Sequence, residues 1–433
     1  MVLRSMASLT LALLLSSWAG MPQPAASTKP ASRSAPLILG INTHFGSKVT
    51  GSNYVPGQSA TAIRRLGFES WRDVASMGRF TRLRAGSALE KSVLGQFGAF
   101  ATSAATPQSP LLIVNTWPEG STPANRVQAF AAALQQGLSA FPRGSLIEIW
   151  NEWDKNPDNQ TGGTVEGYAN LVNASVPAIR RALPAAKVLI GGAADDQQDL
   201  EFRWTKALLR RPEAALADGV SVHVYNHCSA PRRNRAAADM IGRLDRLRAD
   251  MVAIGKSSMP IYVSEFGWPT DGGTCHISPD EAAAAVAQFT LLANSRPWIA
   301  GIWYYELKDS GTNPDDIESH FGLYDFNMAP KPGACAATLA NQLVRRGTVL
   351  QTYEGDDLTA VLVRTGSTVQ TIAWATKANT PATLQVGKTV MARPFCAPSQ
   401  SVSGSYRLSG TPVVLPGDML PRVGAAGGTS ALR

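Results

Sequence analysis

The sequence LIEIWN at positions 146–151 is followed by TVEGYANLVNASVPAIRRAL at 164–183 and by KVLIGG at 187–192. The first and third runs are short, β-rich and bounded by turn residues, which predicts two strands. The run between them predicts a helix. A helix that crosses between two neighbouring strands requires these strands to be parallel. Residues 146–192 therefore predict one parallel β/α unit.

The same unit recurs along the chain. Eight strand-like runs have starts that lie 31 to 43 residues apart, and helical segments fill nearly every gap between them. The runs are 37–42, 68–74, 111–116, 146–151, 187–192, 220–225, 261–265 and 299–305. Eight β/α units over about 310 residues predict a fold of the α/β class, a (β/α)8 TIM barrel that spans residues 37–346.

The helical segments are marked by their ends and lengths. They are 122–141, 164–183, 235–254, a segment that begins at Ser278, and 334–346. At Ser278 the chain offers a capping serine, then a proline and two acidic residues near the positive end of the helix. A doubly wound open sheet is the alternative fold. The first strand, however, is not followed by a GxGxxG loop, and no complete Walker loop, GxxxxGK[ST], occurs elsewhere.

Composition limits the class of protein. The chain has 433 residues, of which 44% are hydrophobic and 17% charged. This is too apolar for a disordered chain and too evenly spread for a polytopic membrane protein. The 40 Lys and Arg residues exceed the 32 Asp and Glu residues without a concentrated tract, and the longest cluster is RRNR at 232–235. We expect no nucleic-acid partner.

The N-terminus has the pattern of a secretory signal peptide. Arg4 precedes the apolar run LTLALLL at 9–15, and Ser17 and Ala19 are small residues at the positions that a signal peptidase reads. We predict a signal peptide over residues 1–19, a retained membrane anchor being the alternative. A flexible Pro/Ala/Ser-rich leader is predicted over 20–36. The mature protein is expected to be secreted or periplasmic, with no stable membrane span.

Residues 347–433 form a second unit. The helical rhythm stops near residue 347, and alternating runs follow at 358–363 and 369–375, with a Gly/Pro-rich tail after 417. This predicts a small β-sandwich-like domain with a flexible tail. Its function is either carbohydrate binding or structural support of the barrel, and the second is favoured.

Four cysteines, Cys228, Cys275, Cys335 and Cys396, form an even set in an exported chain, which favours disulfides. Three pairings are possible. We favour Cys228 with Cys275, because both follow strands in loops on one face of the barrel, and Cys335 with Cys396, which would join the last helix to the β-domain. No CxxC occurs, so no metal site is expected.

Two of the predicted strands end in glutamate. The fourth continues as IEIWNEWD at 147–154, and the seventh reads IYVSEFGW at 261–268. Side-chain alternation places Glu148, Trp150 and Glu152 on one face. Since reacting groups lie at the C-terminal ends of barrel strands, Glu152 and Glu265 are expected to face the same mouth.

Two carboxylic acids that face each other across a concave site suit glycoside hydrolysis, in which one protonates the leaving oxygen and the other attacks or activates water. The two acids need different pKa values for these roles. Trp150 and Trp153 flank Glu152 in the sequence. An apolar setting of this kind predicts a raised pKa for Glu152.

The endings Trp150-Asn151-Glu152 and Val263-Ser264-Glu265-Phe266-Gly267 resemble the two signatures of clan A glycoside hydrolases, which are retaining (β/α)8 enzymes. The resemblance covers the whole barrel. It implies that Glu152 is the acid/base, that Glu265 is the nucleophile and that Asn151 holds the sugar 2-hydroxyl. Trp153 stands where the common pattern has proline, which leaves the acid/base intact.

The same resemblance implies further substrate-binding residues. His223 and Tyr225 match the His and Tyr that often lie near the nucleophile, with Tyr225 as hydrogen-bond donor to Glu265. Arg72 resembles the strand-two arginine that keeps the nucleophile ionised. Aromatic platforms for the sugar are expected from Trp303 or Tyr305, Trp117 and Trp268. No metal or organic cofactor is called for.

Within the clan the chain looks most like family 39, which includes exported exopolysaccharide glycosidases. We therefore expect a secreted retaining glycosidase that cleaves β-glycosidic bonds, endo-acting on a bacterial exopolysaccharide or another β-glycan. The expected separation of its carboxyl groups is about 5 to 5.5 Å. The alternatives are an exo-acting β-xylosidase-like enzyme, a non-catalytic polysaccharide-binding protein and a structural periplasmic interaction protein.

Overall fold

The structure is a computed structural model that describes residues 26–29, 33–46, 53–77, 96–107, 109–138, 141, 144–155, 163–194, 200–271, 273–377 and 380–421. The predicted signal peptide (1–19) and the end of the predicted tail (422–433) lie outside these residues.

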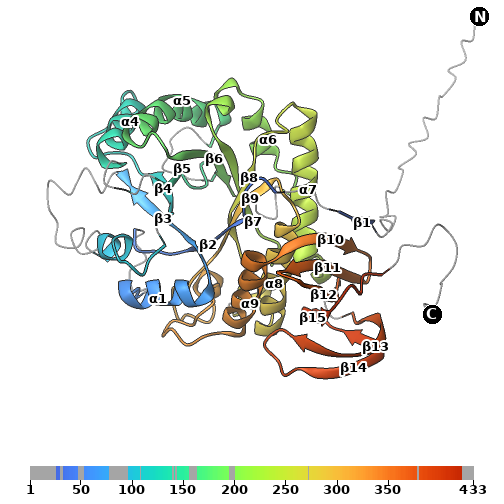
Figure 1. The fold of residues 1–433 in the computed structure, drawn as a ribbon. Helices are drawn as coiled ribbons and strands as arrows, with labels where there is room; N and C mark the ends of the chain where they lie inside the picture. The colour runs from blue at the N-terminus through green and yellow to red at the C-terminus, as the bar shows by residue number, and fades with distance from the viewer. Residues whose placement is uncertain are drawn as a thin grey trace, which may run out of the picture.

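Eight parallel strands close into a barrel, as predicted (Figure 1). They are β2 (Ile38–Asn42), β3 (Ser70–Ser76), β4 (Leu111–Asn115), β5 (Leu146–Ile149), β6 (Lys187–Ala193), β7 (Gly219–Val224), β8 (Ile261–Phe266) and β9 (Ile299–Tyr304). Each strand pairs with the next in sequence, and β9 pairs with β2 to close the ring. The strands are buried on nearly all sides, which is why their sequences are apolar runs rather than alternating patterns.

Helices cover the outside of the barrel. Those described are α1 (Pro56–Leu66), α4 (Arg126–Gly137), α5 (Val165–Ala182), α6 (Arg203–Leu209), α7 (Ala237–Ala253), α8 (Pro279–Asn294) and α9 (Pro332–Arg346). Single turns of 3-10 helix lie in the connections: η3 (Pro212–Leu216), η4 (Arg232–Arg235), η5 (Gly273–Cys275) and η6 (Ile317–His320). The Thr164 side chain caps α5, and Ser278 and Glu281 form a reciprocal capping box at the start of α8. No helix in the described part of the chain is both long and apolar enough to cross a membrane.

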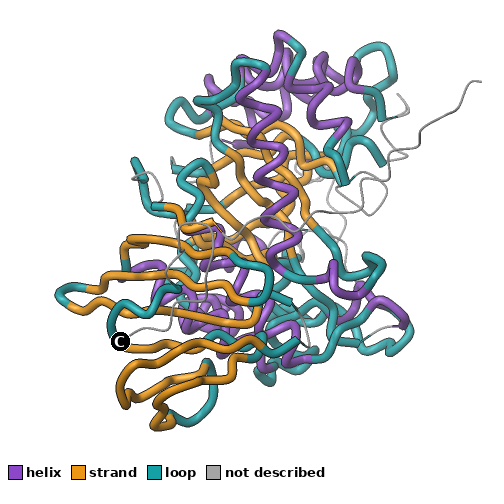
Figure 2. Tube along the Cα trace, turned by 90° about the vertical axis from the view of Figure 1, so that its right-hand side faces the viewer, coloured by secondary structure: helices purple, strands orange, loops and turns teal. Residues whose placement is uncertain are grey.

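The predicted β-domain is present beside α8 and α9 (Figures 1 and 2). Its strands are β10 (Thr348–Glu354), β11 (Leu358–Thr365), β12 (Thr368–Ala375), β13 (Ala382–Pro394), β14 (Gln400–Leu408) and β15 (Val413–Pro416). They are antiparallel in the order β10-β11-β12-β15-β13-β14. Apolar residues of β11, β12 and β15 pack with those of the β13–β14 hairpin in one buried cluster, which gives a sandwich-like arrangement.

We predicted a flexible leader over residues 20–36. This prediction is wrong for the part of the segment that the structure describes. Ala26–Thr28 forms strand β1, which pairs antiparallel with β10. The Arg33 guanidinium donates to the carbonyls of Ala293 and Asn294, at the end of α8, and to those of Arg296 and Ile299. These carbonyls include groups that a helix end leaves without partners, so the segment is held to the folded body.

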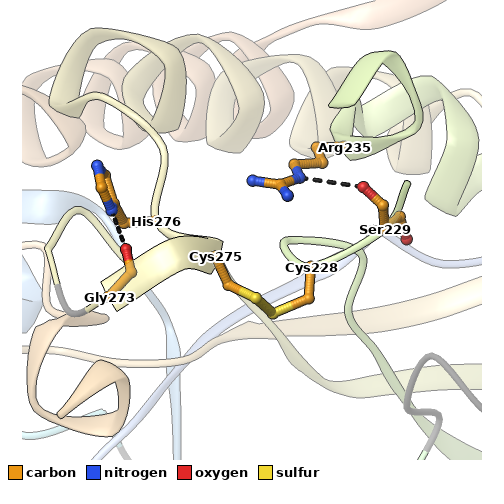
Figure 3. The surroundings of a disulfide bond; sticks show 6 residues. All are labelled: Cys228, Ser229, Arg235, Gly273, Cys275 and His276. Carbon is orange, nitrogen blue, oxygen red and sulfur yellow. Dashed lines mark hydrogen bonds between the residues drawn. A yellow bond between two sulfur atoms is a disulfide. The ribbon is translucent and has the colours of Figure 1, made fainter. Parts of the chain in front are cut away.

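Both favoured disulfides are present. Cys228, after β7, is joined to Cys275, in η5 after β8, as Figure 3 shows. Cys335 of α9 is joined to Cys396, which follows β13. The first bond ties together two loops on the side where the barrel strands end, and the second ties the last helix to the β-domain.

Candidate active site

The two glutamates of the sequence motifs lie at the C-terminal ends of β5 and β8. Strand β5 ends at Ile149, and the chain then turns, with a φ of 68° at Trp150 and 47° at Glu152. The Glu152 N–H donates to Gly192 O, which holds this turn against the end of β6. Glu152 therefore reaches the mouth from a turn rather than from a continued strand.

This turn corrects the prediction that Glu148, Trp150 and Glu152 share a face. The Trp150 side chain is buried, with its ring against Trp117 and Trp153. Glu148 is buried in the polar centre of the site. The positive φ at Trp150 breaks the two-residue alternation on which the prediction rested.

Arg72 of β3 is the centre of the site. Its side chain is buried, and all five of its N–H groups have acceptors. Nε donates to Glu148 Oε2 (2.6 Å), Nη1 to Asn42 Oδ1 (2.9 Å) and Glu265 Oε1 (2.6 Å), and Nη2 to Asn151 Oδ1 (2.8 Å) and His223 Nε2 (3.2 Å). One guanidinium of β3 thus joins residues at or near the ends of four other strands, β2, β5, β7 and β8.

Glu265 is fixed by a donor at each oxygen. Arg72 contacts Oε1, and the Tyr225 hydroxyl donates to Oε2 at 2.8 Å. Burial and the charge of Glu265 raise the pKa of Tyr225 well above its usual value, so the hydroxyl keeps its proton and remains a donor. These contacts orient the carboxylate and leave it only 11% exposed.

Glu152 is bound by His223. A guanidinium only donates, so His223 Nε2 accepts from Arg72 and the ring proton lies on Nδ1. Nδ1 is 3.0 Å from Glu152 Oε1 and 3.5 Å from Glu265 Oε2. The Glu152 side chain is 35% exposed, so a substrate can reach it.

The prediction of a raised pKa for Glu152 is wrong in this structure. Burial alone raises the pKa of Glu152, but the hydrogen bond from His223 and the positive charges of Lys155 and Arg72 outweigh it, and the pKa is lowered. The two tryptophans that were expected to raise it pack their rings into the barrel wall.

Glu152, His223 and Glu265 offer three ligand atoms that lie within 4.8 Å of one another. Such a group could hold a metal ion by distance alone. The donor set does not fit a metal well, because a metal on His223 Nδ1 would move the ring proton to Nε2, which faces the guanidinium of Arg72 and must accept from it.

Of the predicted aromatic platforms, Trp303 lies elsewhere. It is fully buried, its indole N–H donates to Ser70 Oγ, and its ring fills the space beside Gly40 and Gly301, where a side chain would collide with it. It packs with Tyr262 inside the barrel toward the N-terminal ends of the strands. The prediction that Trp303 lines the mouth is therefore wrong.

Of the other aromatic residues that were predicted as platforms, one is buried and two are half-buried. Trp268 is buried behind the site, where it donates to Asn226 and packs on Phe289, so it does not line the mouth either. Trp117 is half-buried after β4. Tyr305, the alternative to Trp303, is half-buried after β9 and makes edge-to-face contacts with Tyr225.

Several polar residues at the mouth were not predicted. The Glu306 carboxylate, fully buried, accepts from the Tyr54 hydroxyl (3.0 Å) and pairs with His44 (2.9 Å). Burial lowers the pKa of His44, but the charge of Glu306 and its hydrogen bond reverse this, so the pKa is raised. His44 follows the first barrel strand and Glu306 follows the last. Their positions directly after predicted strands could have identified them as candidate site residues.

Glu318 of η6 is a further carboxyl near the site. The residue is exposed, yet desolvation at the mouth and the negative charges of Glu265, Glu152, Glu306 and Asp316 raise its pKa to about 7. Glu318 lies in a long connection after β9, and this position in the sequence does not mark it as a residue of the site.

The fold is similar to those of solved glycoside hydrolases. A family 39 glycoside hydrolase from the gut symbiont Bacteroides cellulosilyticus WH2 has a TM-score of 0.67 and 20% identity, covering 88% of this chain and 81% of that chain. A monomeric β-xylosidase from Caulobacter crescentus CB15 has a TM-score of 0.60 and 13% identity, covering 90% and 97%. The catalytic domain of GH30 xylanase C from Talaromyces cellulolyticus has a TM-score of 0.53 and 10% identity, covering 90% and 98%.

No protein-family model matches the sequence, and no curated protein matches it. At the identities of the structural matches, the likeness establishes the fold of this chain.

Proposed function

We propose that the protein is a retaining glycoside hydrolase that cleaves β-glycosidic bonds. The observation that carries the proposal is the pair of glutamates: carboxylate oxygens of Glu152 and Glu265, from opposite sides of the barrel mouth, lie within 4.8 Å of each other. Retaining enzymes hold their two carboxyl groups about 5 to 5.5 Å apart, whereas inverting enzymes leave room for a water molecule between theirs. The resemblance of the two motifs to clan A supports the same reading.

In the first step Glu265 attacks the anomeric carbon, and the protonated form of Glu152, the minor form at neutral pH because its pKa is lowered, gives its proton to the departing oxygen. The C–O bond to the leaving group breaks as the glycosyl–Glu265 ester forms. In the second step Glu152, now a carboxylate, takes a proton from water as the water attacks the anomeric carbon and releases Glu265. Two displacements at one carbon retain its configuration.

The surrounding residues have positioning roles. Arg72 and Tyr225 fix the two oxygens of Glu265 for attack. Arg72 also holds Asn151 through Oδ1, so the amide N–H groups of Asn151 point away from the guanidinium and can donate to a sugar hydroxyl. His223 keeps Glu152 beside the nucleophile.

We propose further that the enzyme is exported and acts on a polymer, as an endo-glycosidase on a bacterial exopolysaccharide or another β-glycan. The signal-peptide pattern and the two disulfides support export. An exo-acting enzyme remains the alternative, since one of the similar structures is a β-xylosidase.

The mechanism is tested with aryl β-glycosides and the variants Glu265→Gln and Glu152→Gln, with Glu166→Gln on the outer surface of α5 as control. Loss of the acid/base should cost about 10²- to 10⁴-fold in rate, and loss of the nucleophile should leave only background hydrolysis. Proton NMR of the first product should show the same anomeric configuration as the substrate; an inverted product would refute the mechanism.

The polymer is tested by release of reducing ends from bacterial exopolysaccharides and plant β-glycans. Endo action should lower the viscosity of the polymer before monosaccharide accumulates, whereas exo action should release monosaccharide from the start. If the wild type and the Glu265→Gln variant bind a polymer equally and neither cuts any glycoside, the protein is a binding protein on a barrel that has lost catalysis.

A further inference from the structure

The β-domain carries charge of one sign over most of its length. Residues 358–417 contain five Lys or Arg residues and no Asp or Glu. All five are exposed: Arg364, Lys377, Lys388, Arg393 and Arg407. The helix that precedes the domain, α9, also ends in two arginines, Arg345 and Arg346. This surface attracts anionic partners.

Part of this surface is a groove between α9 and the β-domain, which we call the α9 groove. It has a volume of about 650 Å³. The polar and aromatic residues that line it include Gln342, Arg346, Gln370, Arg393, Phe395 and Ser399. None of the lining residues in the described part of the chain is acidic.

The groove is held in shape from two sides. Gln370 is only 7% exposed; its Oε1 accepts from Arg393 Nη2 (3.3 Å), and its Nε2 donates to Thr365 Oγ1 (3.4 Å). The Cys335–Cys396 disulfide joins α9 to the turn on the opposite wall. The guanidinium of Arg393 is therefore positioned before any ligand binds.

The two arginines of the groove have remaining donors. Within the described ranges, neither Arg346 nor Arg393 forms an ion pair. Guanidinium groups bind carboxylates in a two-pronged geometry, and the nearby Gln and Ser side chains are suited to hydroxyl groups. Together these groups match a chain of sugars that carry carboxylates.

We propose that the α9 groove is a second binding site, specific for an acidic polysaccharide with uronic acid residues. The inference rests on the proposed function as a polysaccharide hydrolase and names the class of its polymer. Because barrel helices run back from the mouth, the last turns of α9 lie toward the opposite end of the barrel from Glu152 and Glu265. The groove thus anchors the polymer away from the point of cleavage.

The test uses polygalacturonate as the probe and the mature chain with Glu265→Gln, so that the polymer stays intact. Binding is measured by calorimetry at about 0.15 M salt. The double variant Arg346→Gln/Arg393→Gln is compared with Lys377→Gln/Lys388→Gln, which removes the same number of positive charges from β-domain positions outside the groove. Carboxyl-reduced polygalacturonate is the neutral control polymer.

We expect the groove variant to bind polygalacturonate at least tenfold more weakly than the parent, and the control variant to bind within about threefold of it. The carboxyl-reduced polymer should bind weakly to all three proteins. No binding by the parent, an equal loss in both variants, or equal affinity of the parent for single-stranded DNA or anionic lipid vesicles would overturn the proposal.

The same double variants with Glu265 intact are assayed on an aryl β-glycoside. Unchanged activity in the groove variant shows that it is folded, so that its loss of binding belongs to the groove. If the wild type cleaves no glycoside, the proposed function fails, while the binding comparison still decides whether the groove recognises uronate polymers.

Discussion

The hydroxyl group of Tyr225 donates a hydrogen bond to one oxygen of Glu265. The role of this hydrogen bond can be tested by removing the hydroxyl oxygen alone. Tyr225→Phe removes a hydrogen bond to a carboxylate that is about 1.5 to 3 kcal/mol in strength. We expect kcat/KM for an aryl glycoside to fall about 10- to 100-fold. Tyr353→Phe, on β10 of the β-domain, is the matched control. Activity within twofold of wild type in Tyr225→Phe would contradict the positioning role.

Glu318 leads to a prediction about pH. Its pKa is raised from the model-peptide value of 4.5 to about 7, so its carboxyl stays protonated in the folded state where it would be ionised in the unfolded chain. The folded state therefore binds more protons between about pH 4.5 and 7, and wild-type stability falls as pH rises through this window.

Glu318→Gln has no such proton to lose. The variant should melt at the same temperature as wild type below pH 4.5 and at a higher one at pH 8. Since Glu318 is exposed, solvent screens part of the effect, and we expect a difference of about 1 to 2 °C. Thermal denaturation at pH 4, 6 and 8 measures it; a variant less stable than wild type at pH 8 would show that Glu318 has a favourable partner instead.

Single residues also show where sequence reasoning stops. Glu152 and Glu265 could be placed because a strand end is visible in the sequence. Trp303 could not, because its ring turns down the barrel into space left by Gly301 of its own strand and by Gly40 of β2, which is far away in the sequence. The lowered pKa of Glu152 depends on His223, which is 71 positions away.

At the scale of the element, the eight strands were predicted within about two residues at most ends, because buried parallel strands are apolar runs of uniform spacing. Helix starts with side-chain caps, at Thr164 and Ser278, were predicted as closely. The turn that follows β5 was not predicted. A positive φ at a non-glycine residue has no sequence signature, and here it carries Glu152 to the mouth.

The capping box of α8 gives an element-scale prediction. Ser278 accepts from the Glu281 N–H, and the Glu281 carboxylate accepts from the Ser278 N–H. Ser278→Ala should lower the free energy of unfolding by about 1 kcal/mol and the melting temperature by about 1 to 3 °C. Ser403→Ala, at an exposed position of β14, should change it little. Equal melting temperatures for the two variants would rule out a stabilising cap.

At the scale of the molecule, the barrel and the β-domain are joined by side chains from both. Arg296, before β9, pairs with Asp245 of α7 and with Glu354 of β10. The Gln288 amide of α8 donates to Gly410 O in the β-domain. The sequence predicts the two units but not these contacts, because each depends on how two finished surfaces meet.

Arg33 gives the prediction for the whole molecule. Its guanidinium serves four backbone carbonyls at the end of α8 and the start of β9, and its burial lowers its pKa to about 10. Arg33→Ala removes a charged donor from these carbonyls, of which Ala293 O and Arg296 O keep a backbone donor, and should cost about 1.5 to 3 kcal/mol in the free energy of unfolding. Urea denaturation measures it.

Arg33→Lys is the informative companion variant, because an ammonium group cannot spread its donors over four carbonyls as the planar guanidinium does. We expect it to recover less than half of the loss. Full recovery would mean that charge, rather than the shape of the donor group, holds the segment in place.

Strand β1 affects the tendency of the purified protein to aggregate. Three residues of the N-terminal segment cover the free side of β10, which would otherwise be an open edge of the sheet. Open edges recruit strands from neighbouring molecules. A recombinant form trimmed to residue 37 would keep every residue of the candidate active site and still tend to aggregate at high concentration, whereas one that begins before Ala26 would stay dispersed.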